Sequence, residues 1–590
     1  MEKGNEKQST QSYYNAFASR SGKSDNIGRL ERIDVFRSGF SRYNVRSGDL
    51  FAGSLSKWTS PNCSGFPMDY DRKTNCVYMD GSDGHCLLIG ATGSKKSRLI
   101  VMPTVRLLAA SGEAMIICDP KGEVYRRTAD YLEKHGYDIR AIDLRDPEKG
   151  DGWNILSVPY SLYLDGNIDK ACEFINDITA NLIPITSNDP FWDYSARDML
   201  FGLALLLFKI CKEKQQPADL VNMRSLLKLR IELFSSTSSM RISNSPLWQY
   251  AKEDELIRAR LQGTVVCPSD TMACIISVFD QHMTSFSLQP KMVSLLSHSS
   301  FDLHDIGFGK TAVFLIMPDE KTIYHQIVAI FIKQMYELLI DNAYKNTREY
   351  RFPTRVNFLL DEFTSLPKMT DMPQMITASR SRNIRFMLVI QSKHQLKQRY
   401  AEEAETIMSN CSNWLFLTSR ETELLREISE LSGVTGSNRE PLISVSRLQH
   451  LDKDSGECLV FSGRKYPYFA YLPDIEEYDG NNYALRSLSL RKMPELPESA
   501  YTKEHFFQEL VAPEQREPLP DSPEWRIAQE RHLQKISALN DNGAKIPSDL
   551  NVDDLIARID KKIAELEAEE KEEKTDKEAN LEHPTEEAQE

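Results

Sequence analysis

An α/β fold, in which a parallel sheet covered by helices is interrupted by an all-helical block, is predicted by three features of this sequence. From about residue 85 to 145, short apolar runs alternate with helical stretches in the order β-α-β-α-β, which is typical of a parallel sheet. From about 158 to 305, apolar residues recur with helical spacing and strand-like runs are few. Strand-like runs then return, so the helical block interrupts the α/β region.

The elements follow from their apolar patterns in chain order. Short apolar runs predict the first strands, at His85–Ile89, Ala114–Cys118 and Asp138–Ile142. Helical spacing between them predicts two helices, at Ser97–Ala110 and Val124–His135. Apolar residues at i, i+3 and i+4 predict two helices of the block, at Asp169–Leu182 and Trp192–Cys211. The later strands are expected at Ala312–Met317, Val356–Leu360, Phe386–Ile390, Trp414–Leu417 and Cys458–Phe461.

These patterns divide the chain into six expected parts. Residues 1–84 form an N-terminal arm with lead-in strands, and its first 45 residues or so, rich in Ser, Asn and Arg, are expected to be mobile or loosely packed. The expected parts after it are a nucleotide-binding domain in two pieces (85–157 and 306–475), the inserted all-α domain (158–305), a C-terminal linker region (476–550), and a short amphipathic helix with an acidic disordered tail (551–590).

Charge and composition exclude several classes of protein. The formal charge is −14, of which −7 lies in residues 561–590. This balance excludes a basic protein that coats nucleic acid, although a local basic channel remains compatible with it. No apolar run approaches the 20 or so residues of a membrane-spanning helix, and the polar N-terminus has no signal-peptide core. The ten Cys form no CxxC pair, which indicates a reducing cytoplasm without disulfides or a zinc site.

The first candidate chemical motif is Gly90-Ala-Thr-Gly-Ser-Lys-Lys-Ser97, which follows a predicted strand and opens a helix. In a P-loop, backbone N–H groups wrap the phosphates, a Lys reaches the β/γ-phosphates and a Ser or Thr hydroxyl binds Mg²⁺. Gly90, Lys96 and Ser97 fit the required spacing, whereas Lys95 replaces the second glycine. The candidate nucleotide-binding residues are Gly90, Thr92, Gly93, Ser94, Lys95, Lys96 and Ser97. An ordinary strand-turn-helix with a basic start is the competing interpretation.

The second motif is the apolar strand Val356–Leu360, which ends in Asp361 and Glu362. In a P-loop ATPase, such an Asp holds the Mg²⁺ shell and the Glu polarises the attacking water. Both belong at the carboxyl edge of the sheet, where ligands of α/β proteins bind. Taken together and in this order, the two motifs predict an ATPase that binds ATP and Mg²⁺, with Ser97 and Asp361 as metal ligands.

Further polar residues flank the neighbouring strands. Gln391 ends the strand Phe386–Ile390, where it could sense the γ-phosphate, orient water or simply cap the strand. Arg380, Arg382 and Arg385 lie on the segment leading into that strand, which is expected near the nucleotide edge. One of them could reach a neighbouring subunit's γ-phosphate, although each taken singly is as readily a surface or DNA-facing cation. The charged turn Asp119–Glu123 is equally consistent with a helix cap or a site residue.

These residues, in this order, resemble the TraG/TraD-like coupling proteins of type IV secretion systems. The matching strings are GATGSKKSRLIVMP, CDPKGEVYRRTADYLEKHGY, DGWNIL, DPFWDYSARDML, LLDEFTSLPKM, SRSRNIRFMLVIQSKHQL and NCSNWLFLTSRETE, which span residues 85–475. The LDEF-x-x-LPKM and SRxRNIRFxLVxQS patterns are more specific than the P-loop itself.

The resemblance implies a RecA-like P-loop ATPase motor domain with an inserted all-α domain. It implies a homo-hexameric, ATP-driven DNA translocase of conjugation that links single-stranded DNA with bound relaxase to the secretion channel subunits. When the motifs of the family are matched to this sequence, the resemblance implies that Lys96 and Ser97 bind phosphate and Mg²⁺, that Asp361 holds the metal, and that Glu362 is the catalytic carboxylate. Gln391 senses the γ-phosphate, and Arg380 is the candidate that acts on a neighbouring subunit.

Two departures from the family pattern shape the expectations. The family usually begins with two membrane helices and this sequence shows none, so we expect a cytoplasmic variant at the inner membrane, held there by a separate anchor protein. Lys95 at the second glycine position indicates slower turnover. The competing hypotheses are a recruitment platform for protein or nucleoprotein substrates with a vestigial nucleotide site, and an FtsK- or HerA-like translocase, against which the LPKM and RNIRF strings argue.

Overall fold

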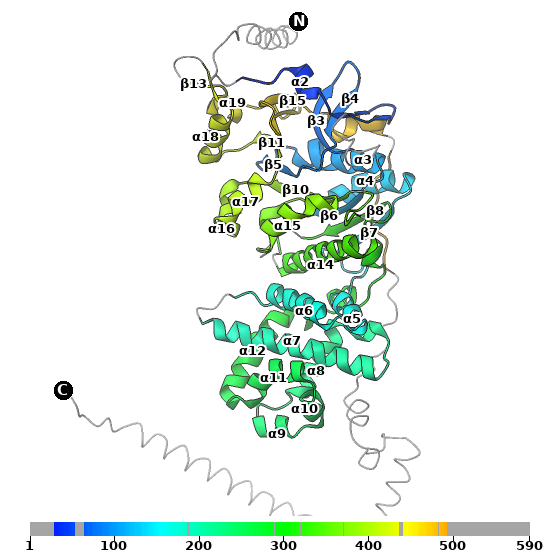
Figure 1. Cartoon of the computed structure of the whole chain (residues 1–590), viewed down its shortest axis with the longest axis vertical. Coiled ribbons are helices and arrows are strands. Elements are labelled where there is room, and N and C mark those ends of the chain that lie inside the picture. Colours follow the sequence, from blue (N-terminus) through cyan, green and yellow to red (C-terminus); the bar gives the residue numbers. More distant parts are fainter. Residues whose placement is uncertain are drawn as a thin grey trace, which may run out of the picture. The chain divides into compact units, whose positions relative to one another are not determined.

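The structure is a computed structural model (Figure 1). It describes residues 29–53, 64–185, 189–287, 289–318, 320–321, 323–347, 349–369, 371–435, 440–481 and 483–491. The first 28 residues, the part of the expected linker after residue 491, and the expected amphipathic helix and acidic tail at 551–590 lie outside the described residues.

A nine-stranded sheet in the order β15-β14-β11-β5-β10-β9-β6-β8-β7 organises the fold. Its strands are β5 (Cys86–Gly90), β6 (Ala114–Asp119), β7 (Asp138–Asp143), β8 (Thr311–Ile316), β9 (Val356–Leu360), β10 (Ile384–Ile390), β11 (Asn413–Thr418), β14 (Glu457–Ser462) and β15 (Tyr468–Tyr471). From β11 to β7 all neighbours are parallel, while β14 and β15 are antiparallel. Each of the expected strands is present, and the α/β fold class is confirmed.

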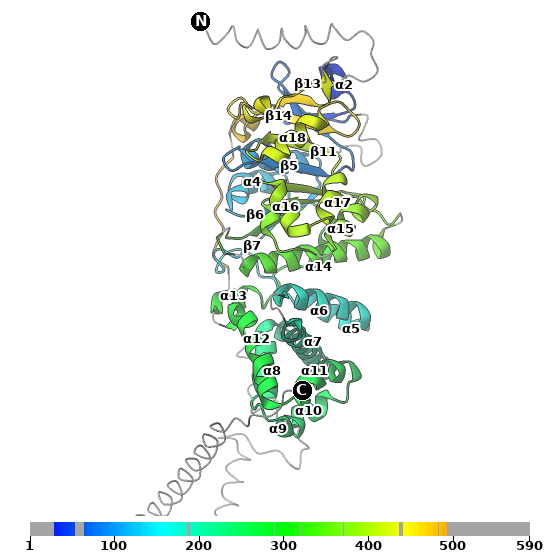
Figure 2. The ribbon, with the colours of Figure 1, turned by 90° about the vertical axis from the view of Figure 1, so that its left-hand side faces the viewer.

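Helices cover both faces of this sheet. The chain crosses from β5 through β6 to β7 in one direction along the sheet and from β8 through β9 and β10 to β11 in the other. Because crossovers between parallel strands are right-handed, the helices of the two series cover opposite faces. The first series carries α3 (Met102–Ala110) and α4 (Glu123–Lys134), and the second carries α14 (Ile323–Asn346), α15 (Met372–Ala378), α16 (Lys393–Tyr400) and α17 (Glu403–Ser409) (Figures 1 and 2).

Shorter elements complete this region. They are α18 (Thr422–Leu431), α19 (Val445–Gln449), the two-stranded ribbon β12 (Val434–Thr435) with β13 (Glu440–Pro441), and the 3₁₀ turns η5 (Phe363–Ser365) and η6 (Ser379–Arg382). The helix predicted over Ser97–Ala110 has a different start from the one expected. Its first turn is the π-helix η2 (Ser97–Val101), and regular α-helical bonding begins only at α3. Such π turns occur frequently at functional sites.

An all-helical region lies between β7 and β8. Its elements are α5 (Ser157–Leu164), α6 (Ile168–Leu182), α7 (Pro190–Glu213), η3 (Ala218–Leu220), α8 (Met223–Leu233), α9 (Ser239–Ser243), α10 (Pro246–Ala251), α11 (Glu255–Val266), α12 (Ser269–Ser287), α13 (Pro290–Leu295) and η4 (Leu303–Asp305). Helix α7 begins with an Asp-Pro start in which the Asp189 carboxylate accepts from the N–H of Phe191. At Gly202 a Cβ would lie 2.5 Å from Leu261 Cγ, so glycine allows α7 and α11 to pack closely.

The longest apolar run of the sequence lies in α7, where Met199–Phe208 are buried. Among the described residues, no single helix has both the length and the apolar character required to cross a membrane. The helices α11 and α12 meet those criteria only when taken together, across a bend of 119°.

The N-terminal region is more ordered than the sequence indicates. Helix α2 (Ile33–Arg37) precedes a four-stranded antiparallel sheet made of β1 (Ser41–Asn44), β2 (Leu50–Phe51), β3 (Phe66–Asp71) and β4 (Cys76–Asp80). Phe36, Phe40, Tyr43 and Val45 are almost fully buried. The expectation of a loosely packed arm is therefore wrong for the described residues 29–45, because a few large apolar side chains among many polar ones are enough to anchor them.

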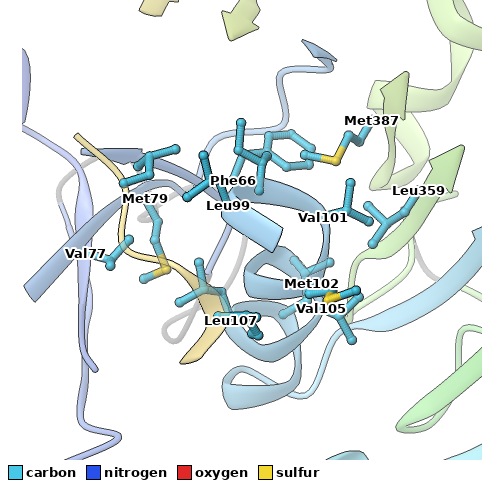
Figure 3. Packing of buried hydrophobic residues seen from close by; sticks show 14 of the residues in the cluster. Phe66, Val77, Met79, Leu99, Val101, Met102, Val105, Leu107, Leu359 and Met387 are labelled. Carbon is cyan, nitrogen blue, oxygen red and sulfur yellow. The ribbon is translucent and has the colours of Figure 1, made fainter. Parts of the chain in front are cut away.

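One continuous hydrophobic cluster supports the helix that follows the Gly90–Ser97 loop. Figure 3 shows Leu99 and Val101 of η2 and Met102 of α3 near Phe66 of β3 and Met387 of β10. Burial of this many apolar side chains holds η2 and α3 firmly between the two sheets. The polar loop at their start is therefore attached to a rigid support.

Residues 474–481 and 483–491 pack against the α/β region, although the sequence analysis assigns most of them to a linker. Tyr478, in η7 (Ile475–Asn481), is fully buried, and Asp474 accepts two hydrogen bonds from the Arg98 guanidinium. Further along, the Arg486 side chain pairs with Asp130 of α4 at 3.0 Å. These polar anchors join positions more than 350 residues apart, so no local pattern in the sequence marks them.

Candidate nucleotide-binding site

The loop Gly90–Ser97 connects the carboxyl end of β5 to η2, as the P-loop motif requires. Within it, Gly93 and Lys95 both adopt positive φ, at 80° and 64°. A Cβ at Gly90 would lie 2.6 Å from Ser94 Oγ, so the loop folds back closely over the strand end. The loop thus has the curved backbone that turns N–H groups toward a bound anion.

Lys95 adopts the left-handed conformation that a P-loop normally gives to glycine. For a residue with a Cβ this conformation costs roughly 1–2 kcal/mol. Its ammonium pairs at 2.8 Å with Asp454, in the turn that precedes β14. Because β14 runs antiparallel to β11, its amino end lies at the carboxyl edge of the parallel strands. Sequence reasoning missed Asp454, since 359 positions separate it from Lys95 and nothing local marks it.

Lys96 is only 8% exposed and lies between a carbonyl and a carboxylate. Its Nζ donates to the carbonyl oxygen of Gly90 at 2.7 Å and lies 4.0 Å from Glu362 Oε1. Burial lowers the pKa of this ammonium, while the negative charges of Glu362 and Asp361 oppose the shift. The structure therefore brings the P-loop lysine and the two carboxylates of the second motif together.

Asp361 and Glu362 follow β9 at the same edge of the sheet. Ser97 Oγ lies 3.4 Å from Asp361 Oδ2, and the N–H of Glu362 donates to Asp361 Oδ1 at 3.0 Å. Burial, reinforced by the charge of Glu362, raises the pKa of Asp361 to about 6. A buried carboxylate of this kind gains from a nearby cation. Glu362 has a φ of 54°, an uncommon backbone conformation of the kind found at active sites.

Gln391 connects the two motifs. Strand β10 lies between β5 and β9, so its carboxyl end places this amide between the P-loop and the carboxylates. Gln391 Nε2 donates to both oxygens of Glu362 at 2.7 Å, and Thr92 Oγ1 donates to Gln391 Oε1 at 2.9 Å. A continuous hydrogen-bond chain thus runs from the loop through Gln391 to Glu362.

Asp119, at the end of β6, is a further carboxylate of this edge. Strand β6 pairs with β9, and Cys118 lies opposite Leu360. The residues that follow them, Asp119 and Asp361, therefore occupy neighbouring positions at the carboxyl edge. Asp119 Oδ2 accepts from the N–H of Tyr125 at 2.8 Å, which makes it a cap of α4. Burial, with a contribution from Asp361, raises its pKa to about 7. The structure thus supports the helix-cap interpretation and also places the carboxyl beside the site.

The donor set at this edge suits a phosphate chain and Mg²⁺. Ser94 Oγ is buried and has no hydrogen-bond partner among the described residues. The Lys96 ammonium donates to a backbone oxygen, which does not neutralise its positive charge as a phosphate would. No group of three or more His, Cys, Asp or Glu side chains with metal-ligand geometry occurs in the described part of the chain. A P-loop Mg²⁺ needs no such group, because a hydroxyl, a carboxylate and phosphate oxygens hold it.

The three arginines around the start of β10 lie elsewhere. Arg380 and Arg382 precede the strand and Arg385 is its second residue, so all three lie at the amino edge of the sheet, and the expectation that this segment is near the nucleotide edge is wrong. Arg380 is exposed and pairs with Asp83 at 3.0 Å. Arg385 is fully buried, with its guanidinium 3.4 Å from Glu113 and over the ring of Phe66. Arg385 is therefore a structural cation that cannot face DNA.

Comparison with known proteins defines the family. Residues 53–449, more than half of the chain, match the family described as "Type IV secretory system Conjugative DNA transfer". The chain belongs to this family. It is similar to the conjugal transfer protein TraG of Escherichia coli, with 23% identity over 420 residues that cover 68% of this chain and 62% of TraG. The chain spans about six tenths of the length of the curated relatives it matches.

Solved structures of the coupling protein TrwB share the fold. The plasmid coupling protein TrwB in complex with the GTP analogue GDPNP is 16% identical, with a TM-score of 0.52 over 79% of this chain and 98% of that chain. TrwB in complex with the ATP analogue ADPNP is 15% identical, with a TM-score of 0.50 over 80% of this chain and 97% of that chain. The α/β fold with its helical region is thus that of the conjugative DNA transfer family.

Proposed function

We propose that the chain is a type IV secretion coupling protein whose motor binds ATP and Mg²⁺ and uses hydrolysis to move DNA. One observation carries the proposal: Lys96, Ser97, Asp361, Glu362 and Gln391 meet at the carboxyl edge of one parallel sheet. TrwB, whose fold the chain shares, has been solved in complex with nucleotide analogues, which supports the same assignment.

Each residue has a role that its position supports. Lys96 would exchange the Gly90 carbonyl for phosphate oxygens, and Ser97 with Asp361 would hold Mg²⁺. When bound, MgATP supplies the phosphoanhydride bond and the charge-neutralising cation. Glu362 would orient the attacking water and accept its proton. Gln391 donates to both oxygens of Glu362, which leaves each oxygen a lone pair that can accept from the attacking water. This coupling makes Gln391 the sensor that links the P-loop to the catalytic carboxylate.

The wider assembly is part of the same proposal. We place the protein in a homo-hexamer at the cytoplasmic face of the inner membrane, with a separate anchor protein, single-stranded DNA carrying a relaxase and the secretion channel subunits as partners. Arg380 is our candidate for the arginine that acts on a neighbouring subunit, because it is exposed and lies away from the site of its own chain.

The test is an ATPase assay with and without single-stranded DNA, run beside a measurement of particle size. We expect DNA to stimulate hydrolysis, and Lys96→Ala to lower the rate by about 10²–10³-fold, the usual effect of removing one group that stabilises the transition-state charge. Lys310→Ala is the matched control, because this exposed lysine bonds only to the His135 carbonyl at the amino edge. Absence of ATP binding, or an unchanged rate in Lys96→Ala, would overturn the proposal.

A recruitment platform with a weak nucleotide site is the second candidate, favoured by the strained Lys95 at a glycine position. Such a platform would bind protein or nucleoprotein substrates but show no DNA-stimulated hydrolysis. The same assay therefore separates the two functions.

A further inference from the structure

An exposed aromatic pair lies at the amino edge of the sheet, away from the nucleotide site. Tyr344, in the last turn of α14, is 67% exposed, and Tyr350, in the loop that follows, is 57% exposed. Their rings stack, with centroids 5.1 Å apart and an interplanar angle of 14°. Together with Ile340, Asp341 and Arg382, they line a cavity of about 350 Å³. Two large rings therefore face solvent at an open hollow.

Two arginines, Arg382 in the cavity wall and Arg351 next to Tyr350, lie beside this aromatic pair. Arg382 donates to the Ala378 carbonyl at 3.1 Å and to Ser381 Oγ at 2.7 Å, and it has no carboxylate partner among the described residues. Arg351 likewise donates to the main-chain oxygens of Arg380 and Ser381. The single carboxylate of the cavity wall, Asp341, is already paired with Lys345 at 2.7 Å. The charge of Arg351 also acts on the Asp83 carboxylate and lowers its pKa, and the exposed Glu349 precedes Tyr350. Of the charged groups that line the cavity, Arg382 is thus the one without an ion-pair partner among the described residues.

The backbone that carries these groups is held firmly. The N–H of Arg351 donates to Thr347 Oγ1 at 2.8 Å, and the N–H of Phe352 donates to the Arg382 carbonyl at 3.1 Å. The Asn383 side-chain amide donates to the Phe352 carbonyl at 3.0 Å. Tyr350 itself has a φ of 55°, which is unusual for a bulky residue and persists only where surrounding contacts impose it. The rings and guanidinium groups are therefore arranged before any partner binds.

We propose that this Tyr–Arg surface, formed by Tyr344, Tyr350, Arg351 and Arg382, is a stacking site for the bases of single-stranded nucleic acid. Exposed aromatic faces accept bases of any sequence, and nearby arginines attract the phosphates. The inference rests on the proposed function in that DNA is the cargo, and it assigns that cargo a contact surface. Strand β10 separates this surface from the carboxyl edge by about 20 Å, so binding here leaves the nucleotide site free.

The experiment measures binding of the full chain, without nucleotide, to labelled oligothymidine and to an abasic oligomer of equal length by fluorescence anisotropy. We expect the double variant Tyr344→Ala/Tyr350→Ala to bind oligothymidine about 5- to 100-fold more weakly. Its affinity for the abasic oligomer should stay unchanged, because that ligand has phosphates but no bases. The double Phe variant should bind as the parent does, since it retains both rings.

The salt dependence of the DNA affinity distinguishes the contribution of the arginine from that of the aromatic rings. Removing one phosphate contact in Arg382→Gln should reduce the slope of log affinity against log salt by about 0.7, whereas the Tyr variants should leave that slope unchanged. Tyr466→Ala is the matched control, because this exposed tyrosine also has an arginine, Arg29, over its ring at 4.4 Å but lies beside β15.

Several results would overturn the inference. Parent-like affinity of the double Ala variant for oligothymidine, or equal losses for both oligomers, would exclude stacking. Unchanged DNA affinity with reduced self-association in sedimentation would instead show that the surface packs against a second copy of the chain. Lys96→Ala should retain oligothymidine binding, so a failed ATPase test and a failed stacking test are distinguishable.

Discussion

The two edges of the central sheet use similar charged residues in opposite ways. At the carboxyl edge, Lys96 bonds to a carbonyl, Ser94 Oγ has no partner in the described structure, and burial raises the pKa of Asp361 to about 6. At the amino edge, the Arg385 guanidinium donates to Asn357, to two main-chain carbonyls and to Glu113. The buried polar groups of the carboxyl edge are ones that a ligand would complete, whereas the buried Arg385 of the amino edge is completed by the fold itself.

This contrast separates function from stability within one sheet. A buried charge whose partners all come from the protein contributes to a unique fold, and its loss leaves an uncompensated partner. A buried polar group with incomplete partners lowers stability and is retained where a ligand supplies the missing interactions. Substitutions of the buried charges at the amino edge should therefore reduce stability, whereas substitutions of the buried polar groups at the carboxyl edge should reduce activity.

Arg385→Met gives the largest expected effect on stability. It would leave Glu113 buried with only the more distant Arg355, at 3.8 Å, as a charged partner. We expect the free energy of unfolding to fall by about 3–5 kcal/mol, the usual cost of removing one member of a buried ion pair. Urea denaturation followed by circular dichroism measures it.

The matched control is Arg380→Ala, which removes an exposed ion pair with Asp83 on the turn leading into the same strand. Its expected cost is below about 1 kcal/mol. Equal losses in the two variants would show that the buried network carries no special stability, and the contrast between the edges would fail.

Much of this organisation could be predicted from sequence, for identifiable reasons. The strands are continuous apolar runs, and residues that end parallel strands, such as Asp361 and Gln391, must meet at one edge. The same rule places Arg380, which precedes a strand, at the other edge. We expected the opposite because Gln391, at the far end of the same strand, belongs to the nucleotide site. The partner of Lys95 could not be predicted, because Asp454 reaches it only through the antiparallel turn before β14.

His85 provides a pH test of the amino edge with an intermediate expected effect. Its Nδ1 accepts from the N–H of Phe386 at 3.0 Å, so its Nε2 carries the proton and donates to the Ile376 carbonyl at 2.7 Å. Burial lowers the pKa of this imidazole from 6.5 to about 4. Between these values the unfolded chain binds a proton that the folded chain does not. Stability should therefore fall as the pH drops from about 6.5 to about 4, by up to about 3 kcal/mol.

The comparison for His85 must be made between the parent and His85→Gln. Asp119 and Asp361 have raised pKa values, so they favour the folded state when protonated and act in the opposite direction over this range. The difference between parent and variant in urea midpoint should shrink as the pH is lowered toward 4. A difference that stays constant with pH would mean that folding does not lower the pKa of His85.

Lys95→Gly should have the smallest effect. It tests whether a residue at the carboxyl edge is kept for function although its backbone conformation lowers stability. Glycine relieves the positive φ of 64°, but it loses the ion pair with the exposed Asp454 and adds freedom to the unfolded chain. These contributions oppose each other, so we expect unfolding free energy to change by less than about 1 kcal/mol and ATP hydrolysis to stay equal or rise. Asp454→Asn should change either property only when Lys95 is present, which a double-mutant cycle measures. A clear fall in hydrolysis in Lys95→Gly would show that this lysine has an acquired role at the phosphates, and that the carboxyl edge tolerates its strain for that reason.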